Sequence, residues 1–511
     1  MYARVLSACL FGLDCEKVRV ESDIENGLSS FNLVGLANRA IKESKERIRS
    51  AVLNSGYDFP DTRITVNLTP AGVQKEGSHF DLAIALSLLA SSGQLEYLEK
   101  FDDMAFLGEL TLNGNISPVD GVLPMVIGLR ERGVKKIMLP KGNINEARLL
   151  SDMEFYPAST LNEAVDHIEG RKKIGKDRGS PEYRKKRAIT EDFSDIKGQE
   201  TVKRAAQIAA AGFHGMLMIG PPGVGKSMIG KRIPGIMPEM TYEQMLGVTQ
   251  IYSISGQLNE ERPVIFERPF RNPHHNTTAV SLVGGGNYPR PGEVSFAHNG
   301  VLFLDELPEF SAKLLESLRQ PLEDGKLTIV RASGKCTFPS RFMLVAAMNP
   351  CRCGYYGDPN RKCSCTESER LRYISKISGP LLDRIDLHIA MQRPTYVELN
   401  EGSERKIIDS ASLKEGIATA VEIQKRRYVD EHIDSNSALS ASMIRKYCVM
   451  TDDAESVLKT AFTKFRLSAR SYHRLIKVSR TVADLGKSSA IQKEHVLEAL
   501  SYRIPDDFFR G

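Results

Sequence analysis

A glycine-rich segment that ends in lysine and serine carries the clearest chemistry in this sequence. Residues 220–227 read Gly-Pro-Pro-Gly-Val-Gly-Lys-Ser and fit the pattern G-x-x-x-x-G-K-[ST] without a gap. An apolar run from Met216 precedes them and a helical pattern follows, which is the context that the motif needs. There, backbone N–H groups surround phosphates, the lysine reaches the β- and γ-phosphates and the serine hydroxyl ligates Mg²⁺. We predict an ATP site formed by Gly220, Pro221, Pro222, Gly223, Val224, Gly225, Lys226 and Ser227.

Two further apolar runs end in polar residues that suit the same site. Residues 301–306 read Val-Leu-Phe-Leu-Asp-Glu, and four apolar residues in a row are typical of a central parallel strand. Asp305 is expected to hold Mg²⁺, directly or through water, and Glu306 to polarise the attacking water. A third run, 342–348, ends at Asn349, which is expected to orient that water. A plain Asn-Pro turn is the alternative interpretation of Asn349.

Two arginines are candidates for the charge that develops on the γ-phosphate. Arg384 is a candidate arginine finger, a cation that one subunit supplies to the nucleotide of its neighbour. An ion pair with Asp383 or Asp386 is the alternative. In the helical C-terminal part, Arg470 is expected to contact the γ-phosphate, and Arg474 is its rival one helical turn away.

Four cysteines lie close together in the sequence. Cys351 and Cys353 form one C-x-C pair, and Cys363 and Cys365 form a second. Four thiolates can complete a tetrahedral zinc site, although C-x-C is tighter than the usual C-x₂-C spacing. The segment between the pairs has few apolar residues and therefore little reason to fold without a metal. A structural zinc and reduced thiols both remain open interpretations.

The whole chain has the composition of a globular protein with several domains. It has 511 residues, a formal net charge of +5, 41% hydrophobic residues and 26% charged residues. No apolar run approaches the roughly 20 residues that a membrane span needs, and the start lacks the features of a signal peptide. We therefore expect a cytoplasmic protein that does not interact with membranes.

Changes in composition divide the chain into parts. We expect a mixed α/β domain at 1–170, a basic linker at 171–190, a P-loop α/β core at 191–395 and a helical lid at 396–511. The fold class is thus α/β with several domains.

The order of these motifs resembles the AAA+ superfamily. The sequence segments between these motifs resemble the Mg-chelatase-like branch of that superfamily. Examples are Arg268-Pro-Phe-Arg-Asn-Pro-His-His275 and residues 291–298. That resemblance implies an insert in helix 2, here within about 250–298, and a β-hairpin before the sensor strand, here Lys326 to Pro339. Gly334 would then lie at the turn of the hairpin.

The N-terminal region resembles the Lon protease domain, an α/β fold related to ribosomal protein S5. The resemblance lies in residues 108–121 and 133–140. Lon uses a serine-lysine dyad, but Leu123 and Pro124 stand where the lysine is expected. Ser78 then has no base to activate it. We predict a Lon-like fold without peptidase activity.

Together the parts resemble the ComM family. The resemblance implies a homo-hexameric DNA helicase that drives branch migration in natural transformation, together with ATP, Mg²⁺ and recombination proteins. DNA contacts are expected from Lys326, Arg331 and Lys335 through phosphates, and from His274 and His275. The alternatives are a protein-remodelling factor and a Mg-chelatase-type motor subunit.

Overall fold

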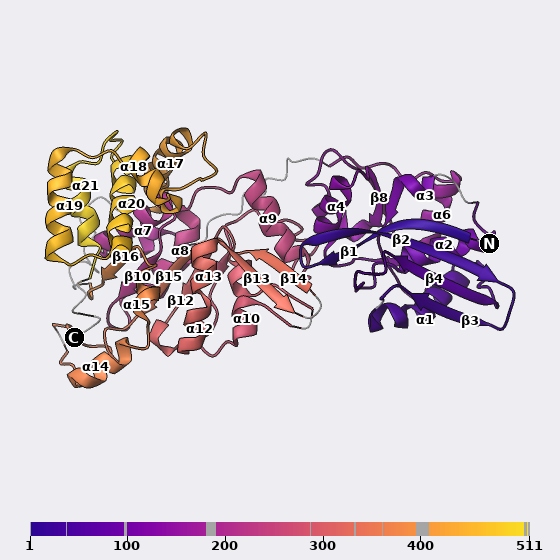
Figure 1. Ribbon diagram of the computed structural model, residues 1–511, viewed down its shortest axis with the longest axis horizontal. Helices are drawn as coiled ribbons and strands as arrows, with labels where there is room; N and C mark the ends of the chain where they lie inside the picture. The colour runs from indigo at the N-terminus through magenta and orange to yellow at the C-terminus, as the bar shows by residue number, and fades with distance from the viewer. Residues whose placement is uncertain are drawn as a thin grey trace.

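The computed structural model describes residues 2–36, 38–96, 100–179, 191–286, 288–331, 334–359, 361–394, 408–504 and residue 508. Two sheets organise these residues in two lobes along the long axis of the molecule (Figure 1). No helix among the described residues is long and apolar enough to cross a membrane.

The first lobe is built on a seven-stranded mixed sheet with the order β3-β4-β2-β1-β5-β8-β9. β1 and β2 form a long antiparallel hairpin, and β1 then pairs in parallel with β5. The strands are β1 Tyr2–Phe11, β2 Asp14–Glu25, β3 Ser30–Val34, β4 Arg63–Thr69, β5 Met104–Phe106, β8 Lys136–Pro140 and β9 Glu154–Ala158. The main helices are α1 Arg39–Asn54, α2 Asp81–Ser91, α4 Val122–Glu131 and α6 Leu161–Glu169. α2 is buried at every residue, which suits a helix whose sequence is apolar except at Asp81, Ser87 and Ser91.

The first part of the expected linker packs against this lobe. Asp177 forms a β-bridge with Phe155 of β9, and Arg148 donates hydrogen bonds to its carboxylate. Ile174 joins the apolar core of the lobe. Residues 171–179 therefore extend the first domain, and residues 180–190 lie outside the described residues.

The second lobe contains a five-stranded parallel sheet with the order β11-β12-β15-β10-β16. β10, β12 and β15 are buried at every residue, as expected for strands covered on both faces. The strands are β10 Met216–Ile219, β11 Phe270–Arg271, β12 Val301–Leu304, β15 Met343–Met348 and β16 Leu387–Ala390. The helices are α7 Glu200–Gly212, α8 Lys226–Ile236, α9 Tyr242–Ser253, α10 Ala279–Val283, α11 Glu293–Phe296, α12 Ala312–Ser317, α13 Arg319–Asp324, α14 Glu367–Ile374 and α15 Gly379–Leu382.

The described C-terminal residues are helical and pack on the second sheet through α7. The helices are α17 Ser410–Arg427, α18 Ala441–Tyr447, α19 Asp452–Lys464, α20 Ala469–Leu485 and α21 Lys493–Ser501. Apolar residues from α7, α17 and α20 share one core with the strands. The multidomain α/β fold class is therefore confirmed.

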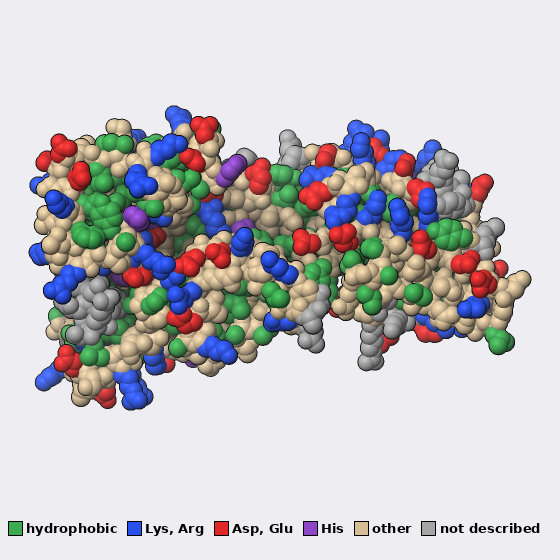
Figure 2. Space-filling view, in the orientation of Figure 1, with side chains coloured by type: hydrophobic (Ala, Val, Ile, Leu, Met, Phe, Trp, Pro, Cys, Tyr) green, Lys and Arg blue, Asp and Glu red, His purple; other side chains and the backbone are tan. Residues whose placement is uncertain are grey.

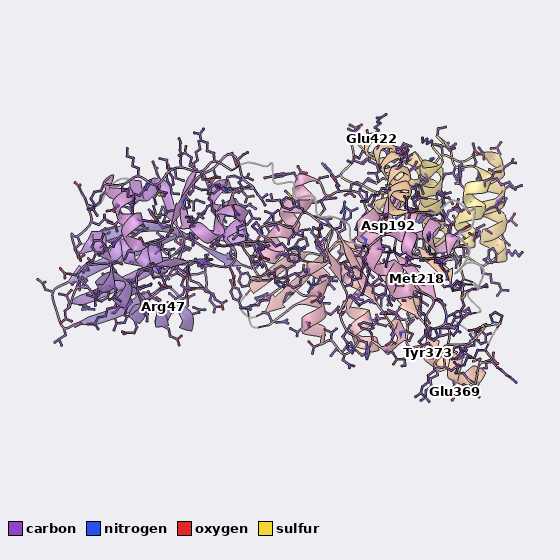
Figure 3. The ribbon with its side chains drawn as sticks, turned by 180° about the vertical axis from the view of Figure 1, so that it is seen from behind. Arg47, Asp192, Met218, Glu369, Tyr373 and Glu422 are labelled. Atoms are coloured by element: carbon purple, nitrogen blue, oxygen red, sulfur yellow. The ribbon has the colours of Figure 1, made fainter. Side chains whose placement is uncertain are left out.

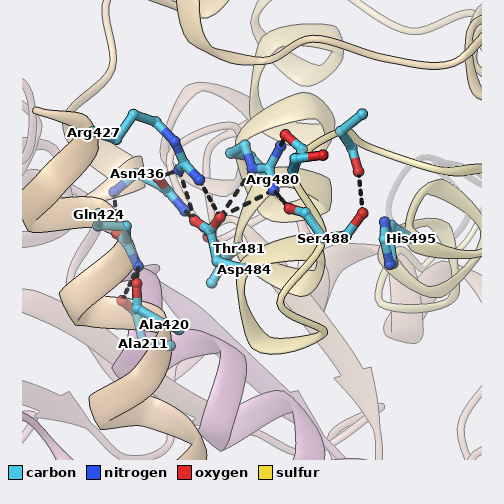
Figure 4. A network of polar contacts seen from close by, with 12 residues as sticks. Ala211, Ala420, Gln424, Arg427, Asn436, Arg480, Thr481, Asp484, Ser488 and His495 are labelled. Carbon is cyan, nitrogen blue, oxygen red and sulfur yellow. Dashed lines mark hydrogen bonds and ion pairs between the residues drawn. The ribbon is translucent and has the colours of Figure 1, made fainter.

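A buried polar network fastens this helical lid (Figure 4). Asp484 is fully buried and accepts hydrogen bonds from Arg427, Arg480 and Asn436. Gln424 donates a hydrogen bond to the carbonyl of Ala211 at the end of α7, with an N···O distance of 2.9 Å. The lid and the α/β core are thus joined by satisfied polar groups as well as by apolar packing.

The two lobes meet through the turn of the β1–β2 hairpin and through α4 (Figure 1). Phe11 and Leu13 pack on the apolar side of a second hairpin, β13 Lys326–Arg331 and β14 Gly334–Pro339. Tyr242 of α9 donates a hydrogen bond to the carbonyl of Leu149, with an O···O distance of 2.6 Å. Both the β13–β14 hairpin and α9 of the second lobe therefore contact the first lobe.

Candidate nucleotide site

The glycine-rich loop runs from the end of β10 into the start of α8. Gly223 has φ +81° and Gly225 has φ +92°, a left-handed region that favours glycine. A Cβ atom built at either glycine would meet no other atom within 4 Å. The loop therefore opens onto free space at the N-terminus of an eleven-residue helix, where backbone N–H groups and the helix dipole favour a phosphate.

The side chain of Lys226 lies folded along this loop. Its Nζ donates hydrogen bonds to the carbonyls of Gly220 and Pro221, at 2.7 and 2.9 Å. A third bond of 3.1 Å reaches Oδ1 of Asn349 at the end of β15. Burial lowers the pKa of Lys226 to about 8, and the nearby carboxylates of Asp305 and Glu306 oppose that effect. A bound phosphate would restore the charge that burial disfavours.

Ser227 and Asp305 come from neighbouring elements and meet directly. The Ser227 hydroxyl donates to Oδ2 of Asp305, with an O···O distance of 2.6 Å. Oxygen ligands of this kind, beside a phosphate loop, fit the needs of Mg²⁺ bound with ATP. These residues therefore fit the group that the motif implies.

Glu306 follows at the start of a short 3₁₀ turn. Its φ of +53° is left-handed, and its backbone N–H donates to Oδ1 of Asp305 at 3.0 Å. The side chain is 58% exposed, and Nδ1 of His275 lies 3.8 Å from its Oε2. Glu306 is thus turned toward solvent, where a water molecule can approach it.

The position of His275 was not predicted from the sequence. We expected His274 and His275 to contact DNA, and the structure in addition places His275 beside Glu306 and 6.4 Å, between ring centroids, from Phe310. The two histidine rings lie 4.1 Å apart. No local pattern relates residue 275 to residue 306, because only the tertiary fold brings them together.

The two candidate arginines converge on one acid. Arg384 and Arg470 both form ion pairs with Glu323 of α13. Only 8% of the Arg384 side chain is exposed. Neither acid that we considered as its alternative partner, Asp383 or Asp386, is the carboxylate in this pair. Glu323 itself was not predicted, because nothing in the sequence around it marks it.

Arg474 has a different place from its rival Arg470. Its NH1 donates to the carbonyls of Leu382 and Ile385, and its NH2 lies 3.2 Å from Oδ1 of Asp383. Arg474 therefore holds the loop that carries Arg384 against the lid, and burial lowers the pKa of its guanidinium.

Comparison with known proteins gives the family. Models of magnesium chelatase subunit ChlI match residues 20–143 and 192–399, and a model of its C-terminal part matches residues 408–503. Competence protein ComM of Haemophilus influenzae is 41% identical over 510 residues, covering 98% of this chain and 97% of that protein. The chain belongs to the ComM family. Uncharacterized protein YifB of Escherichia coli is 39% identical over 499 residues, covering 97% and 96% of the two chains. As a Mg-chelatase-like AAA+ protein, this member of the ComM family is an ATPase.

A partial likeness to Lon protease accompanies membership of the ComM family. Lon protease of Chloroflexus aurantiacus is 28% identical over 159 residues, which are 29% of this chain and 19% of that protein. In the first lobe, Ser78 donates a hydrogen bond to Glu109. Leu123 is fully buried against Leu149 and Val264. The position expected for a dyad lysine is therefore part of an apolar contact between lobes.

The expected hairpin of this ComM-family chain is present, with Arg331 paired to Gly334. Lys326, Arg331 and Lys335 are exposed, and residues 332 and 333 lie outside the described residues. Nε of Arg331 donates to the carbonyl of Gly286 at 3.3 Å. Basic side chains lie among acidic ones over this face of the molecule (Figure 2). The hairpin thus presents basic side chains to solvent, and its apolar side packs on Phe11 and Leu13 of the first lobe and on Ile254 and Val283 of the second.

Proposed function

We propose that this protein is a cytoplasmic, homo-hexameric DNA translocase that hydrolyses ATP to drive branch migration during recombination of incoming DNA in natural transformation. Its partners would be single-stranded and branched DNA without sequence preference, and recombination proteins. The ATPase activity follows from the family, and the relation to a competence protein supports the pathway.

The observation that carries the proposal is the way the chain joins the hairpin to the nucleotide site. α13 bears Glu323 and leads directly into β13. β14 leads into β15, which ends beside Asn349, the partner of Lys226. A change at the γ-phosphate can therefore move the start of β13 and the end of β14, and with these strands Lys326 and Lys335.

Within one subunit, each residue of the site has a distinct task. The loop 220–227 and Lys226 bind the phosphates, and Ser227 and Asp305 hold Mg²⁺, which neutralises phosphate charge when bound. Glu306 polarises the attacking water, and Asn349 orients it. His275 lies where it can hold the Glu306 carboxylate in a chosen direction.

Between subunits, Arg384 and Arg470 act together. In the single chain both arginines form ion pairs with Glu323. In the ring, the γ-phosphate bound to a neighbouring subunit would take the place of the Glu323 carboxylate as their anionic partner. Such an exchange makes hydrolysis depend on assembly of the ring.

Stimulation of ATP hydrolysis distinguishes this proposal from its rivals. DNA should accelerate hydrolysis, whereas porphyrin or unfolded protein should not. The double substitution Lys326→Glu and Lys335→Glu should abolish the response to DNA and leave the basal rate unchanged. Lys459→Glu, an exposed lysine on α19, is the matched control. Stimulation by unfolded protein alone would favour the remodelling function instead.

A further inference from the structure

The four clustered cysteines form a compact group in the fold. Their Sγ atoms all lie within 4.8 Å of one another. The Sγ–Sγ distance is 3.3 Å for Cys351 and Cys353, 3.5 Å for Cys353 and Cys363, and 3.7 Å for Cys351 and Cys363. We call the described residues of 350–365 the cysteine knuckle.

These separations suit a metal better than disulfides. A disulfide requires an S–S distance of about 2.05 Å and joins sulfurs two at a time. Four thiolates around one Zn²⁺, each at about 2.3 Å, lie about 3.8 Å apart along the edges of a tetrahedron. The sulfur separations in the knuckle are much longer than a disulfide bond and close to this second arrangement. Four sulfur donors with no oxygen or nitrogen ligand select a soft or borderline metal such as zinc.

The knuckle has almost no apolar core of its own. Between the end of β15 and the start of α14, its described residues form no helix or strand. Within it, only Pro350, Cys351 and Gly354 are buried. A loop of this length without secondary structure needs another source of order, and a bound metal supplies one.

Groups around the sulfurs suit the negative charge of a zinc-tetrathiolate centre. The backbone N–H of Cys365 donates to Sγ of Cys363 at 3.4 Å. Arg361 lies over the ring of Tyr355, 4.0 Å from its centroid. Arg352 and Lys362 are exposed on the same short segment. A backbone N–H that donates to sulfur favours the thiolate over the thiol, and the basic residues give the segment as a whole a positive charge.

The knuckle also lies directly against the nucleotide site. A Cβ atom on Gly354 would come within 2.8 Å of Cδ of Pro222 in the phosphate loop. Asn349, which accepts a hydrogen bond from Lys226, directly precedes the knuckle, and its backbone is hydrogen-bonded to the hydroxyl of Tyr373 on α14. Tyr373 and Glu369 mark α14 in Figure 3. The knuckle therefore begins at Asn349, and the helix that follows the knuckle reaches back to the same residue.

We propose that Cys351, Cys353, Cys363 and Cys365 bind one Zn²⁺, and that the knuckle it orders holds Asn349 against the phosphate loop. The first part stands on the sulfur geometry alone. The second part rests on the role in hydrolysis proposed for Asn349. Zinc here is structural: it positions a residue of the ATPase site and touches no reacting atom.

Metal analysis of the purified full chain tests the binding site, independently of any activity. We expect about one zinc per chain in the wild type and in Cys448→Ser, whose cysteine is buried in the lid. Cys363→Ser should lose the zinc, whereas Cys365→His should retain it, because imidazole is also a zinc ligand. Cobalt substituted for zinc should give thiolate-to-metal absorption bands that Cys363→Ser lacks. Iron in place of zinc, or equal zinc in wild type and Cys363→Ser, would overturn the assignment.

Hydrolysis and nucleotide binding then test the positioning role. Cys363→Ser should lower ATP turnover at least about tenfold while ATP affinity changes less than about threefold. The double variant Cys363→Ser with Asn349→Ala should lose no more ATP turnover than Asn349→Ala alone, because both changes remove the same contact. If the fold-losses in turnover of the two single variants multiplied in the double variant, the knuckle and Asn349 would act independently, which would contradict the proposed role. If Cys363→Ser is insoluble, removal of zinc from the wild type by a chelator, followed by its return, should abolish and then restore turnover. Turnover unchanged by zinc removal would equally contradict the role.

Discussion

At the scale of single residues, motif spacing predicts which residues gather around the glycine-rich loop. Gly220 to Ser227, Asp305 and Asn349 come together because each ends a strand of one parallel sheet, and such ends meet at one edge. His275 and Glu323 could not be predicted in this way. Each reaches its partner through loops whose paths depend on the whole fold.

Replacement of the acid that polarises water should separate binding from hydrolysis. We predict that Glu306→Gln binds ATP normally and hydrolyses it about 10² to 10⁴ times more slowly, because an amide cannot act as a base. Nucleotide binding and single-turnover hydrolysis measure the two effects. Glu309→Gln, an exposed acid three residues further on, should keep wild-type turnover. Normal turnover in Glu306→Gln would remove that residue from the mechanism.

The histidine beside Glu306 provides a second test at this scale. His275→Ala should lower the turnover number and leave ATP affinity unchanged, because His275 contacts Glu306 but not the phosphate loop residues that bind it. His274→Ala is the neighbouring control and should have a smaller effect on turnover. A loss of DNA binding in His275→Ala, with basal turnover intact, would instead support the DNA contact that the sequence first indicated.

At the scale of elements, the sequence predicts strands and the hairpin but not what covers them. The hairpin is what the resemblance to the Mg-chelatase-like branch implies, and residues 326–331 and 334–339 form its two strands. The docking of Phe11 and Leu13 on its apolar side depends on how two lobes meet. The lid network likewise joins residues far apart in the chain, since Gln424 binds Ala211 and Asp484 binds Arg427.

Loss of the central acid of this network should weaken the lid. Asp484→Ala leaves Arg427 and Arg480 buried without their carboxylate, and breaking a buried ion pair costs about 3 to 5 kcal/mol. We predict an earlier first transition in thermal unfolding and faster hydrogen exchange in α17 and α20. Asp430→Ala, at an exposed acid just past α17, should melt like the wild type. Equal melting temperatures for Asp484→Ala and Asp430→Ala would mean that the network contributes little to the stability of the lid.

At the scale of the whole molecule, the contact between lobes contains a buried acid. Glu146 accepts hydrogen bonds from the Ser253 hydroxyl of α9, from Asn143 and from the backbone of Leu123. Burial nevertheless raises its pKa to about 7, and these hydrogen bonds lower it only in part. The protonated form of Glu146 is therefore favoured in the docked lobes.

This acid makes stability depend on pH in a defined direction. The folded chain keeps the proton up to pH of about 7, whereas an unfolded glutamate releases it near pH 4.5. Between these values the folded state binds more protons, so stability falls as pH rises, by at most about 1.4 kcal/mol per pH unit. We predict that Glu146→Gln loses this slope between pH 5 and 7 in thermal unfolding, compared with wild type. An unchanged slope would show that Glu146 is already ionised in the fold.

Assembly is tested by mixing subunits. Arg384→Ala subunits should inhibit wild-type subunits beyond simple dilution, because each one removes a cation from the nucleotide site of its neighbour. ATPase rates across a series of mixing ratios measure this. Arg319→Ala, at a partly exposed arginine that begins α13, serves as the control. A linear decline with the fraction of Arg384→Ala would place the arginine's effect within its own subunit.

The central claim is that ATP hydrolysis moves DNA. Strand displacement and branch migration on labelled Holliday-junction and three-stranded DNA, with the wild type and Lys226→Ala, test it most directly. The account predicts ATP-dependent product from the wild type and none from Lys226→Ala, whose phosphate loop lacks its cation. No product from either protein, together with an ATPase rate that DNA does not change, would contradict the account and favour a motor that acts on protein.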